Sequence, residues 1–413
     1  MPGYQLATMS TLSGALFDGV FGTGQAVYLR KRTPNCRWSS VVYPAAGMAG
    51  TGESDPWIAV LGSRRERWGG ERRRRHIFRR LVERMDGDIV TGWSWEAIRP
   101  VLGGSSLRIP GLGTPPRRPK LVSGEMLDLD VVQRLRQRAD LVAVAIYDDP
   151  IPHHAALGVE LTPDAAAALQ RRRDANVDAF RWLVMPTLAL AELAGLPVER
   201  VIAGENGTDT TRIVPGVWPE DPAIGFISGA APGRGIEAMI EAARQLRAEI
   251  PTLRLLLWLV ATGSQTAAYL ATLREAIRRD RWIEVESVEP DQQSSAYRQA
   301  TLFCISHPGH PYWDATLPVK IFDALAAGRP LVITPRTETR RLVERYDVGL
   351  VATGDSADEL AAAMRPLLVD GARSRELGAR ARRVAEELYD WPKVGDRIAS
   401  AILEREGQRL ESR

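Results

Sequence analysis

The chain has 413 residues, of which 45% are hydrophobic and 25% charged, and its formal net charge is +3. This length indicates two domains, and the composition excludes a disordered or fibrous protein. No run of about 18 apolar residues predicts a membrane-spanning helix, and two cysteines are too few for a disulfide framework or a zinc site. The N-terminal residues lack the basic and apolar regions of a signal peptide, so we expect a cytoplasmic protein.

Apolar runs alternate with helical periodicity in the first half of the chain. The apolar runs predict strands at residues 4–10, 39–44, 57–62, 88–93, 139–148 and 180–186. The periodic segments predict helices at residues 24–32, 74–85, 163–177 and 187–196. At residues 215–222 two prolines flank an acidic pair, which indicates an interdomain linker.

The alternation then restarts and continues to the end of the chain. The apolar runs predict strands at residues 223–229, 253–262, 282–288, 302–306, 330–334 and 349–353. Helices are predicted at residues 235–250, 267–279, 294–300, 319–328, 338–346, 357–370 and 374–389. This pattern is typical of parallel sheets with helices on both faces, so we expect an α/β protein with two doubly wound domains. Because ligands of such sheets bind outside the carboxyl ends of the strands, the cleft between the domains is the expected site.

The segment "LPVKIFDALAAGRPLVIT" at residues 317–334 carries the clearest chemical signal. Pro318 suits the start of a helix, whose free amides and positive dipole end attract an anion. Lys320 in the same turn is unfavourable unless a negative group lies in front of it. A diphosphate would supply that charge, and Asp323 could accept hydrogen bonds from the adjoining ribose diol. The alternative is that Lys320 is solvated and that Asp323 is its routine partner three residues along the helix.

This segment resembles the nucleotide-sugar site of retaining GT-B glycosyltransferases, in particular glycosyltransferase family 4. The pattern of Pro318, Lys320 and Asp323, followed by Ala-x-Ala-Gly-x-Pro and an apolar strand, carries the likeness. It extends to "RVIAGENGTDTTRIVPG", "FISGAAPGRGIEAMIEA", "EPDQQSSAYRQATLFCISH", "VGLVATGDSADELAAAMRPLLVD" and "ELYDWPKVGDRI". The likeness implies an acceptor-binding domain at residues 1–215, a nucleotide-sugar domain at residues 223–390, and a helix at residues 391–413 that crosses back.

The resemblance also implies roles for individual residues in the second domain. Arg234 and Lys320 would contact the donor diphosphate and stabilise the leaving group without a metal. The donor would also contact Gly229, the backbone of Thr316 and Leu317, and the ribose-binding Asp323. Asp323 stands where the family usually has glutamate, and the first acid of its Glu-x7-Glu pattern falls at Ala315. The strand end at residues 286–290 lies where the base usually binds, through backbone atoms that do not identify it.

Two segments of the first domain are weaker candidates. Gly22 and Gly24 form either a dinucleotide fingerprint that lacks its third glycine, a loop that approaches the donor, or an ordinary turn. Several polar residues follow a predicted strand end or precede the segment predicted to bind the donor. They would either contact the acceptor or be ordinary solvated loop residues. These residues are Asp148, Asp149, His153, His154 and His307. The adjacent histidines are too few to predict a metal site.

The most basic segment covers residues 64–84, where Ile77, Phe78 and Leu81 share one helical face among arginines. It could be a surface helix packed on its sheet, or an interfacial helix that contacts anionic lipid. A nucleic-acid patch is the third alternative, but the low net charge and the absence of a nucleic-acid motif argue against it.

We therefore expect a metal-independent enzyme that moves a hexosyl group from a nucleoside-diphosphate sugar, of UDP or GDP type, to an acceptor hydroxyl. The acceptor would be a glycan, a lipid-linked molecule or a small molecule, and the resemblance implies retention at the anomeric carbon. Two alternatives are a catalytically silent GT-B homologue that binds a glycan or a protein, and a nucleotide-sugar epimerase. An epimerase needs acid–base carboxylates in the cleft, for which only Asp148 and Asp149 are candidates. A dinucleotide-dependent dehydrogenase is disfavoured because Val27 occupies the third glycine position.

Overall fold

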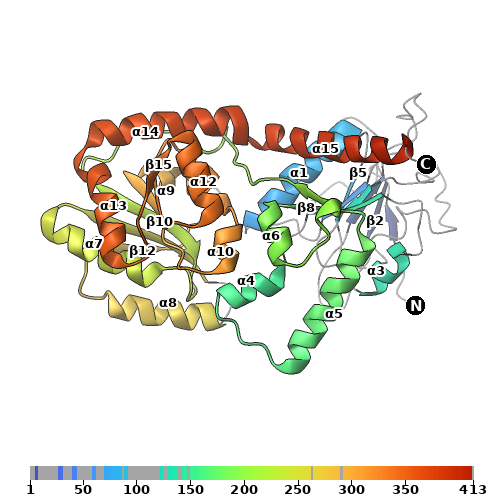
Figure 1. The fold of residues 1–413 in the computed structure, drawn as a ribbon, viewed down its shortest axis with the longest axis horizontal. Helices are drawn as coiled ribbons and strands as arrows, with labels where there is room; N and C mark the ends of the chain where they lie inside the picture. The colour runs from blue at the N-terminus through green and yellow to red at the C-terminus, as the bar shows by residue number, and fades with distance from the viewer. Residues whose placement is uncertain are drawn as a thin grey trace.

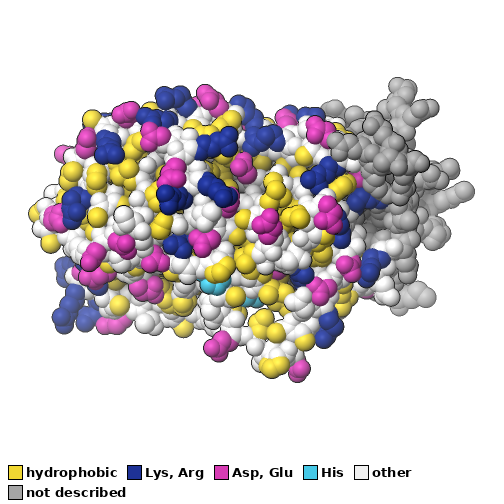
Figure 2. Space-filling view, viewed as in Figure 1, with side chains coloured by type: hydrophobic (Ala, Val, Ile, Leu, Met, Phe, Trp, Pro, Cys, Tyr) yellow, Lys and Arg dark blue, Asp and Glu magenta, His cyan; other side chains and the backbone are white. Residues whose placement is uncertain are grey.

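The computed structural model describes most of the chain after residue 148 and shorter segments before it. The described residues are 5–7, 27–30, 40–43, 58–61, 69–85, 88–91, 121–123, 129–136, 142–146, 149–261, 264–288 and 292–411. Among these residues, no helix is long and apolar enough to cross a bilayer. Basic and acidic side chains are interspersed over the second half on the face shown in Figure 2.

The second half is built on one parallel sheet of six strands with the order β12-β11-β10-β13-β14-β15. Its strands are β10 (Ala223–Gly229), β11 (Arg254–Val260), β12 (Ile283–Glu286), β13 (Leu302–Ile305), β14 (Leu331–Ile333) and β15 (Gly349–Val351). The central strands are apolar on both faces, as a parallel sheet covered by helices requires. In sequence order this is the 3-2-1-4-5-6 arrangement of a doubly wound fold, whose order reverses between β10 and β13.

Helices cover both faces of this sheet (Figure 1). One face packs on α7 (Ile236–Glu249), α8 (Ser264–Ala276) and α13 (Ala357–Val369). The other packs on α9 (Gln293–Arg298), α11 (Val319–Ala326), α12 (Thr337–Tyr346), the end of α14 (Gly371–Val384) and the π-helical turn Ala385–Tyr389. The short helix α10 (Pro311–Ala315) lies between β13 and α11.

The linker predicted at residues 215–222 forms no helix or strand and is anchored by one buried arginine. Arg329 is fully buried and donates to the carbonyls of Gly216, Val217 and Arg298. Its guanidinium lies over the Trp218 ring, 4.1 Å from the ring centroid. A fully buried cation needs such acceptors, so these contacts fix the segment that joins the two halves.

The first half contains shorter sheets. Four parallel strands have the order β6-β7-β8-β9, and β4 pairs with β5 in parallel. These strands are β4 (Ile58–Leu61), β5 (Asp88–Thr91), β6 (Leu121–Ser123), β7 (Val142–Ile146), β8 (Trp182–Met185) and β9 (Val201–Ala203). The described helices are α1 (Gly69–Met85), α3 (Leu129–Arg136), α4 (Pro150–Ala156), α5 (Pro163–Ala179) and α6 (Leu188–Leu193).

The N-terminal segments differ from the sequence-based expectation. A helix was expected at residues 24–32, but β2 (Val27–Arg30) is a strand. It pairs antiparallel with β1 (Gln5–Ala7) and β3 (Ser40–Tyr43), whereas the strands of the other described sheets pair in parallel. The segment "VYLR" combines β-branched and aromatic residues, which favour strands, and a nine-residue window is too short for periodicity to decide.

The last helix, α15 (Trp391–Glu411), leaves the second half and packs on the first (Figure 1). Trp391, Val394 and Ile398 form a buried cluster with residues of β8, β9 and α1. The apolar face of α1 belongs to this cluster, and Ile77 and Phe78 are fully buried. The interfacial interpretation of the Arg-rich segment is therefore wrong for this face, because α15 and the sheet cover it.

Candidate active site

A cavity of about 480 Å³ lies between the two halves and brings most of the predicted site residues together. From the predicted set, the lining includes Gly229, Arg234, Thr316, Leu317, Lys320, Asp323 and His153. It lies at the carboxyl ends of β10 and β11, next to the point where the strand order reverses. This is the position where doubly wound sheets bind ligands.

Arg234 lies in the turn that joins β10 to α7. It is flanked by Gly233 and Gly235, whose φ angles are 71° and 72°. A Cβ atom at Gly235 would lie 1.6 Å from the Ser306 carbonyl oxygen, so only glycine fits this turn. The Arg234 guanidinium lies 5.0 Å from the centroid of the Trp313 ring. The turn therefore places a cation at the end of the central strand of the sheet.

Lys320 lies in the first turn of α11, after Pro318, which caps the helix instead of occupying its first turn. Its Nζ is 3.5 Å from Ser228 Oγ and 5.0 Å from the centroid of the Phe226 ring. It forms no ion pair with any residue that the structure describes. Burial, together with repulsion from Arg234, holds the pKa of Lys320 well below its usual 10.5. An anion beside this ammonium would offset both effects.

Asp323 does not pair with Lys320, although the two residues are three positions apart on α11. Its carboxylate is buried and accepts hydrogen bonds from Thr208 Oγ1 at 2.9 Å and Arg72 Nη2 at 2.5 Å. Burial, reinforced by the charge of Asp323, raises the pKa of the Tyr297 hydroxyl well above its usual value. The carboxylate predicted to bind ribose thus lines the cavity while both of its oxygens contact protein groups.

His153 belongs to the first half and faces Arg234 across the cavity. Its Nε2 lies 3.4 Å from Arg234 Nη2, and its ring stacks on Tyr312 with centroids 5.0 Å apart. Burial, then repulsion from Arg234, lowers the pKa of His153 to about 4. The imidazole is therefore neutral near pH 7 and can accept a hydrogen bond.

The other predicted acceptor residues that the structure describes do not line this cavity. Asp149 is 1% exposed, accepts from Ile151 N as the N-cap of α4, and pairs with Arg173 at 2.9 Å. The prediction that it faces the acceptor is wrong, because a helix start and an arginine engage its carboxylate. His307 is also buried and stacks on Trp313 at 3.9 Å, and His154 lies outside the lining.

Three further predicted residues, Gly22, Gly24 and Asp148, lie outside the described residues.

The sequence analysis did not predict the polar side chains of the first half that hold the segment from Ala315 to Leu317. Asn206 Nδ2 donates to the Leu317 carbonyl at 2.5 Å, and Thr187 Oγ1 donates to the Ala315 carbonyl. Arg72, which pairs with Asp323, also lines the cavity. The likeness of "GENGTD" to the end of a first domain was a signal for Asn206, whereas nothing distinguishes Arg72 from its neighbouring arginines.

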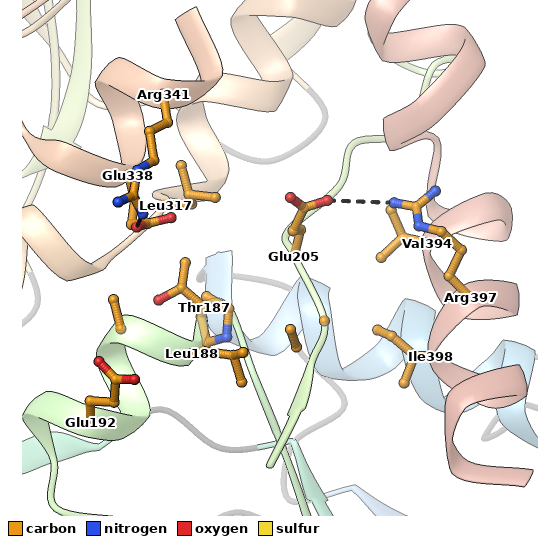
Figure 3. A pocket seen from close by; sticks show the side chains of 14 residues that line it. Thr187, Leu188, Glu192, Glu205, Leu317, Glu338, Arg341, Val394, Arg397 and Ile398 are labelled. Carbon is orange, nitrogen blue, oxygen red and sulfur yellow. Dashed lines mark hydrogen bonds and ion pairs between the residues drawn. The ribbon is translucent and has the colours of Figure 1, made fainter. Parts of the chain in front are cut away.

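A second cavity of about 440 Å³ adjoins the first through Pro186 and Leu317. It is lined by residues from α6, the end of β9, α12 and α15 (Figure 3). Its lining holds two ion pairs and a further acid, Glu192: Glu338 contacts Arg341 at 2.5 Å, and Glu205 lies 3.7 Å from Arg397. Burial raises the pKa of Glu205. This cavity does not offer the excess of cations that a diphosphate needs.

The described residues include no group of three or more His, Cys, Asp or Glu side chains placed to hold a metal ion.

Comparison with known proteins agrees with this geometry. Residues 221–370 match the family model described as Glycosyl transferases group 1. No curated protein matches the chain. Similar solved structures include sucrose-phosphate synthase from Thermosynechococcus elongatus, with 15% identity, 87% of this chain and 100% of that chain covered, and a TM-score of 0.61. HepE of Anabaena in complex with UDP and glucose has 14% identity, covers 84% and 99% of the two chains, and has a TM-score of 0.61.

A glycosyltransferase from Rickettsia africae is similar as well, with 10% identity, coverage of 85% and 99%, and a TM-score of 0.55. At these identities the likeness establishes the fold, and the predicted GT-B arrangement of two Rossmann-like domains is confirmed. The family match over residues 221–370 confirms the prediction of a glycosyltransferase, while membership of glycosyltransferase family 4 stays a prediction.

Proposed function

We propose that this GT-B protein, whose residues 221–370 form a glycosyl transferases group 1 domain, transfers a glycosyl group from a nucleoside-diphosphate sugar to an acceptor hydroxyl. The observation that carries the proposal is the position of Lys320. It is a partly buried lysine in the first turn of α11 that faces a shared cavity, with Arg234 on the same cavity wall.

Electrostatics favour a diphosphate at this position. The ammonium of Lys320 contacts a hydroxyl and an aromatic ring and forms no ion pair among the described residues. Val319 and Lys320, which open α11, line the same cavity, and the free amides of a helix start favour an anion. A diphosphate between Lys320 and Arg234 would form charge-assisted hydrogen bonds and restore the ordinary pKa of the lysine.

The chemistry follows from this placement. The bond between the anomeric carbon and the diphosphate oxygen breaks, and the diphosphate keeps the electron pair. The acceptor oxygen forms the new bond and gives its proton to the departing diphosphate. Lys320 and Arg234 stabilise the charge that develops on the leaving diphosphate, so the step needs no metal in this proposal. Retention at the anomeric carbon is part of the proposal and rests on the resemblance to retaining enzymes.

The sugar and the acceptor would lie toward the first half, where neutral His153 can accept a hydrogen bond from a hydroxyl. A uridine nucleotide is the first donor to test, since the similar HepE structure contains UDP and glucose. A glycan, a lipid-linked molecule and a small molecule all remain as acceptor classes in this proposal.

Calorimetric titration with UDP, GDP, ADP and dTDP, without metal and then with Mg²⁺, tests the donor site. We expect one diphosphate to bind without metal and Lys320→Ala to weaken it. Lys393→Ala is the matched control, because Lys393 lies on α15 outside the cavity and donates to the Glu387 carbonyl. If the folded wild-type protein binds none of the four, the proposed function is wrong.

One observation favours a second candidate, a silent homologue that binds without turnover. Asp323 already contacts Thr208 and Arg72, and Ala315 stands at the first acid position. Hydrolysis or transfer assays with the bound nucleotide sugar separate the two candidates. An epimerase is disfavoured further, because Asp149 is engaged in the fold.

A further inference from the structure

Arg72 joins the two halves of the molecule at the wall of the donor cavity. It lies on α1, and its Nη2 bonds to Asp323 on α11, 251 residues along the chain. Its Nη1 donates to Gln293 Oε1 on α9 at 2.7 Å. Arg72, Asp323 and Gln293 all line the cavity, so three helices bring their polar groups together there.

The Arg72 side chain is more accessible than the Asp323 side chain. The Asp323 side chain is 2% exposed, whereas the Arg72 side chain is 12% exposed. Aspartate is one methylene shorter than the glutamate usual at this position, and Arg72 and Gln293 lie beside it. The polar surface offered to a ligand is therefore shared among a guanidinium, an amide and the edge of a carboxylate.

Charge divides the cavity into two regions. Lys320 and Arg234 form a positive region near the ends of the sheet strands. The ion pair between Arg72 and Asp323 has no net charge, and together with Gln293 it offers both donors and acceptors; Arg73 and Arg74 of α1 also line the cavity. An ion pair with an amide beside it suits hydroxyl groups, which donate and accept at once. A diol attached to a diphosphate is the ribose of a nucleoside diphosphate.

We propose that Arg72 is a donor-specificity residue: with Asp323 and Gln293 it binds the ribose hydroxyls, so that the first half of the chain supplies part of the nucleotide site. A hydroxyl would donate to Asp323, whose carboxylate has more acceptor positions than its two bonds use, and would accept from Arg72. This inference rests on the proposed function, because it requires a nucleoside diphosphate in the cavity.

The test compares the dissociation constants of the nucleoside diphosphate that binds, of its 2′-deoxy form and of inorganic pyrophosphate. A hydrogen bond to a charged group corresponds to roughly a tenfold change in affinity, so the wild-type protein should prefer ribose by about that factor. Arg72→Ala should bring the preference to about twofold or less, with a smaller change for pyrophosphate.

Arg80→Ala is the matched control. Arg80 lies on the same helix and also forms a bridging ion pair, to Asp396 of α15, but does not line the cavity. It should keep the full preference for ribose. Thermal unfolding of each variant establishes that it is folded. If Arg72→Ala does not fold, Gln293→Leu and Arg72→Lys replace it. Each substitution disturbs the hydrogen bonds that join Arg72 to Gln293 and Asp323, while Asp323 keeps a cationic partner.

Each outcome decides the proposal. The inference is overturned if folded Arg72→Ala keeps the wild-type preference for ribose, or if Gln293→Leu and Arg72→Lys both keep it. The proposed function is intact in that case. An equal loss for all three ligands would also overturn it, since the role of Arg72 would then be structural. If the wild-type protein binds none of the nucleotides, the proposed function and this inference are both wrong.

Discussion

Two cations on the donor cavity, Lys320 and Arg72, have opposite surroundings. Lys320 lies on α11 beside β10, where its ammonium contacts the Ser228 hydroxyl and the Phe226 ring and forms no ion pair among the described residues. Arg72 comes from the other half of the molecule and holds the carboxylate of Asp323. The difference shows that cations near a site have two kinds of role. A cation with an internal counter-ion fixes the structure and shapes specificity. A cation without an internal counter-ion is available to an anionic ligand.

The largest effect expected from this comparison is on stability. Asp323→Ala leaves Arg72 partly buried without its carboxylate and should lower the free energy of unfolding by about 3–5 kcal/mol. Chemical denaturation of the wild-type and variant proteins measures the loss. A double variant, Arg72→Met with Asp323→Leu, should lose less, since it leaves no uncompensated charge. A stable single variant would mean that the pair does not hold the two halves together.

Lys320→Ala should act on binding and not on stability. The loss of a charge-assisted phosphate contact should weaken nucleoside diphosphate binding by about 1.5–3 kcal/mol. The melting temperature should stay the same or rise, because the variant removes a charge from a partly buried position. Calorimetry and thermal unfolding, with Lys393→Ala as control, measure both. Unchanged nucleotide affinity would remove Lys320 from the phosphate site.

The lowered pKa of Lys320 predicts a pH dependence with a definite sign. Between that lowered pKa and 10.5, the empty folded protein holds the lysine neutral, whereas the unfolded chain and the complex hold it charged. Stability should therefore rise with pH in this window, and diphosphate affinity should fall. Titrations in buffers of different ionisation enthalpy should detect proton uptake on binding, which Lys320→Ala abolishes. Proton release instead would contradict this account.

Asp149→Asn distinguishes an acceptor residue from a structural one. The amide keeps the cap on Ile151 but weakens the bond to Arg173, so the free energy of unfolding should fall by about 1 kcal/mol. Nucleotide affinity and turnover of the folded enzyme should not change. Lost turnover at unchanged stability would restore Asp149 as an acceptor residue.

The smallest effect is expected for Arg80→Ala. The ion pair between Arg80 and Asp396 is short, at 2.7 Å, but both side chains are about one-third exposed, at 35% and 32%. Water screens such a pair, so its loss should cost less than about 1 kcal/mol of stability. A loss as large as that of Asp323→Ala would mean that docking of α1 on α15 depends on this contact.

The second half was predicted more fully than the first. Its strands at residues 223–229 and 302–306 are continuous apolar runs between well-formed helices, and the structure places β10 and β13 there. In the first half the strands are short, and β6, β9, α3 and α4 were not predicted. Short elements carry too few residues for periodicity to identify them.

The sequence by itself determined the alternation of strands and helices in the second half, the placement of Arg234 in the turn after β10 and the placement of Lys320 in the first turn of α11. These features depend on local pattern, because hydrophobic periodicity and turn residues act over a few positions. Only the tertiary structure decided that Arg72 pairs with Asp323 and that Asp149 pairs with Arg173. Such partners depend on where distant segments return to each other, and a buried carboxylate takes whichever donor the fold brings within reach.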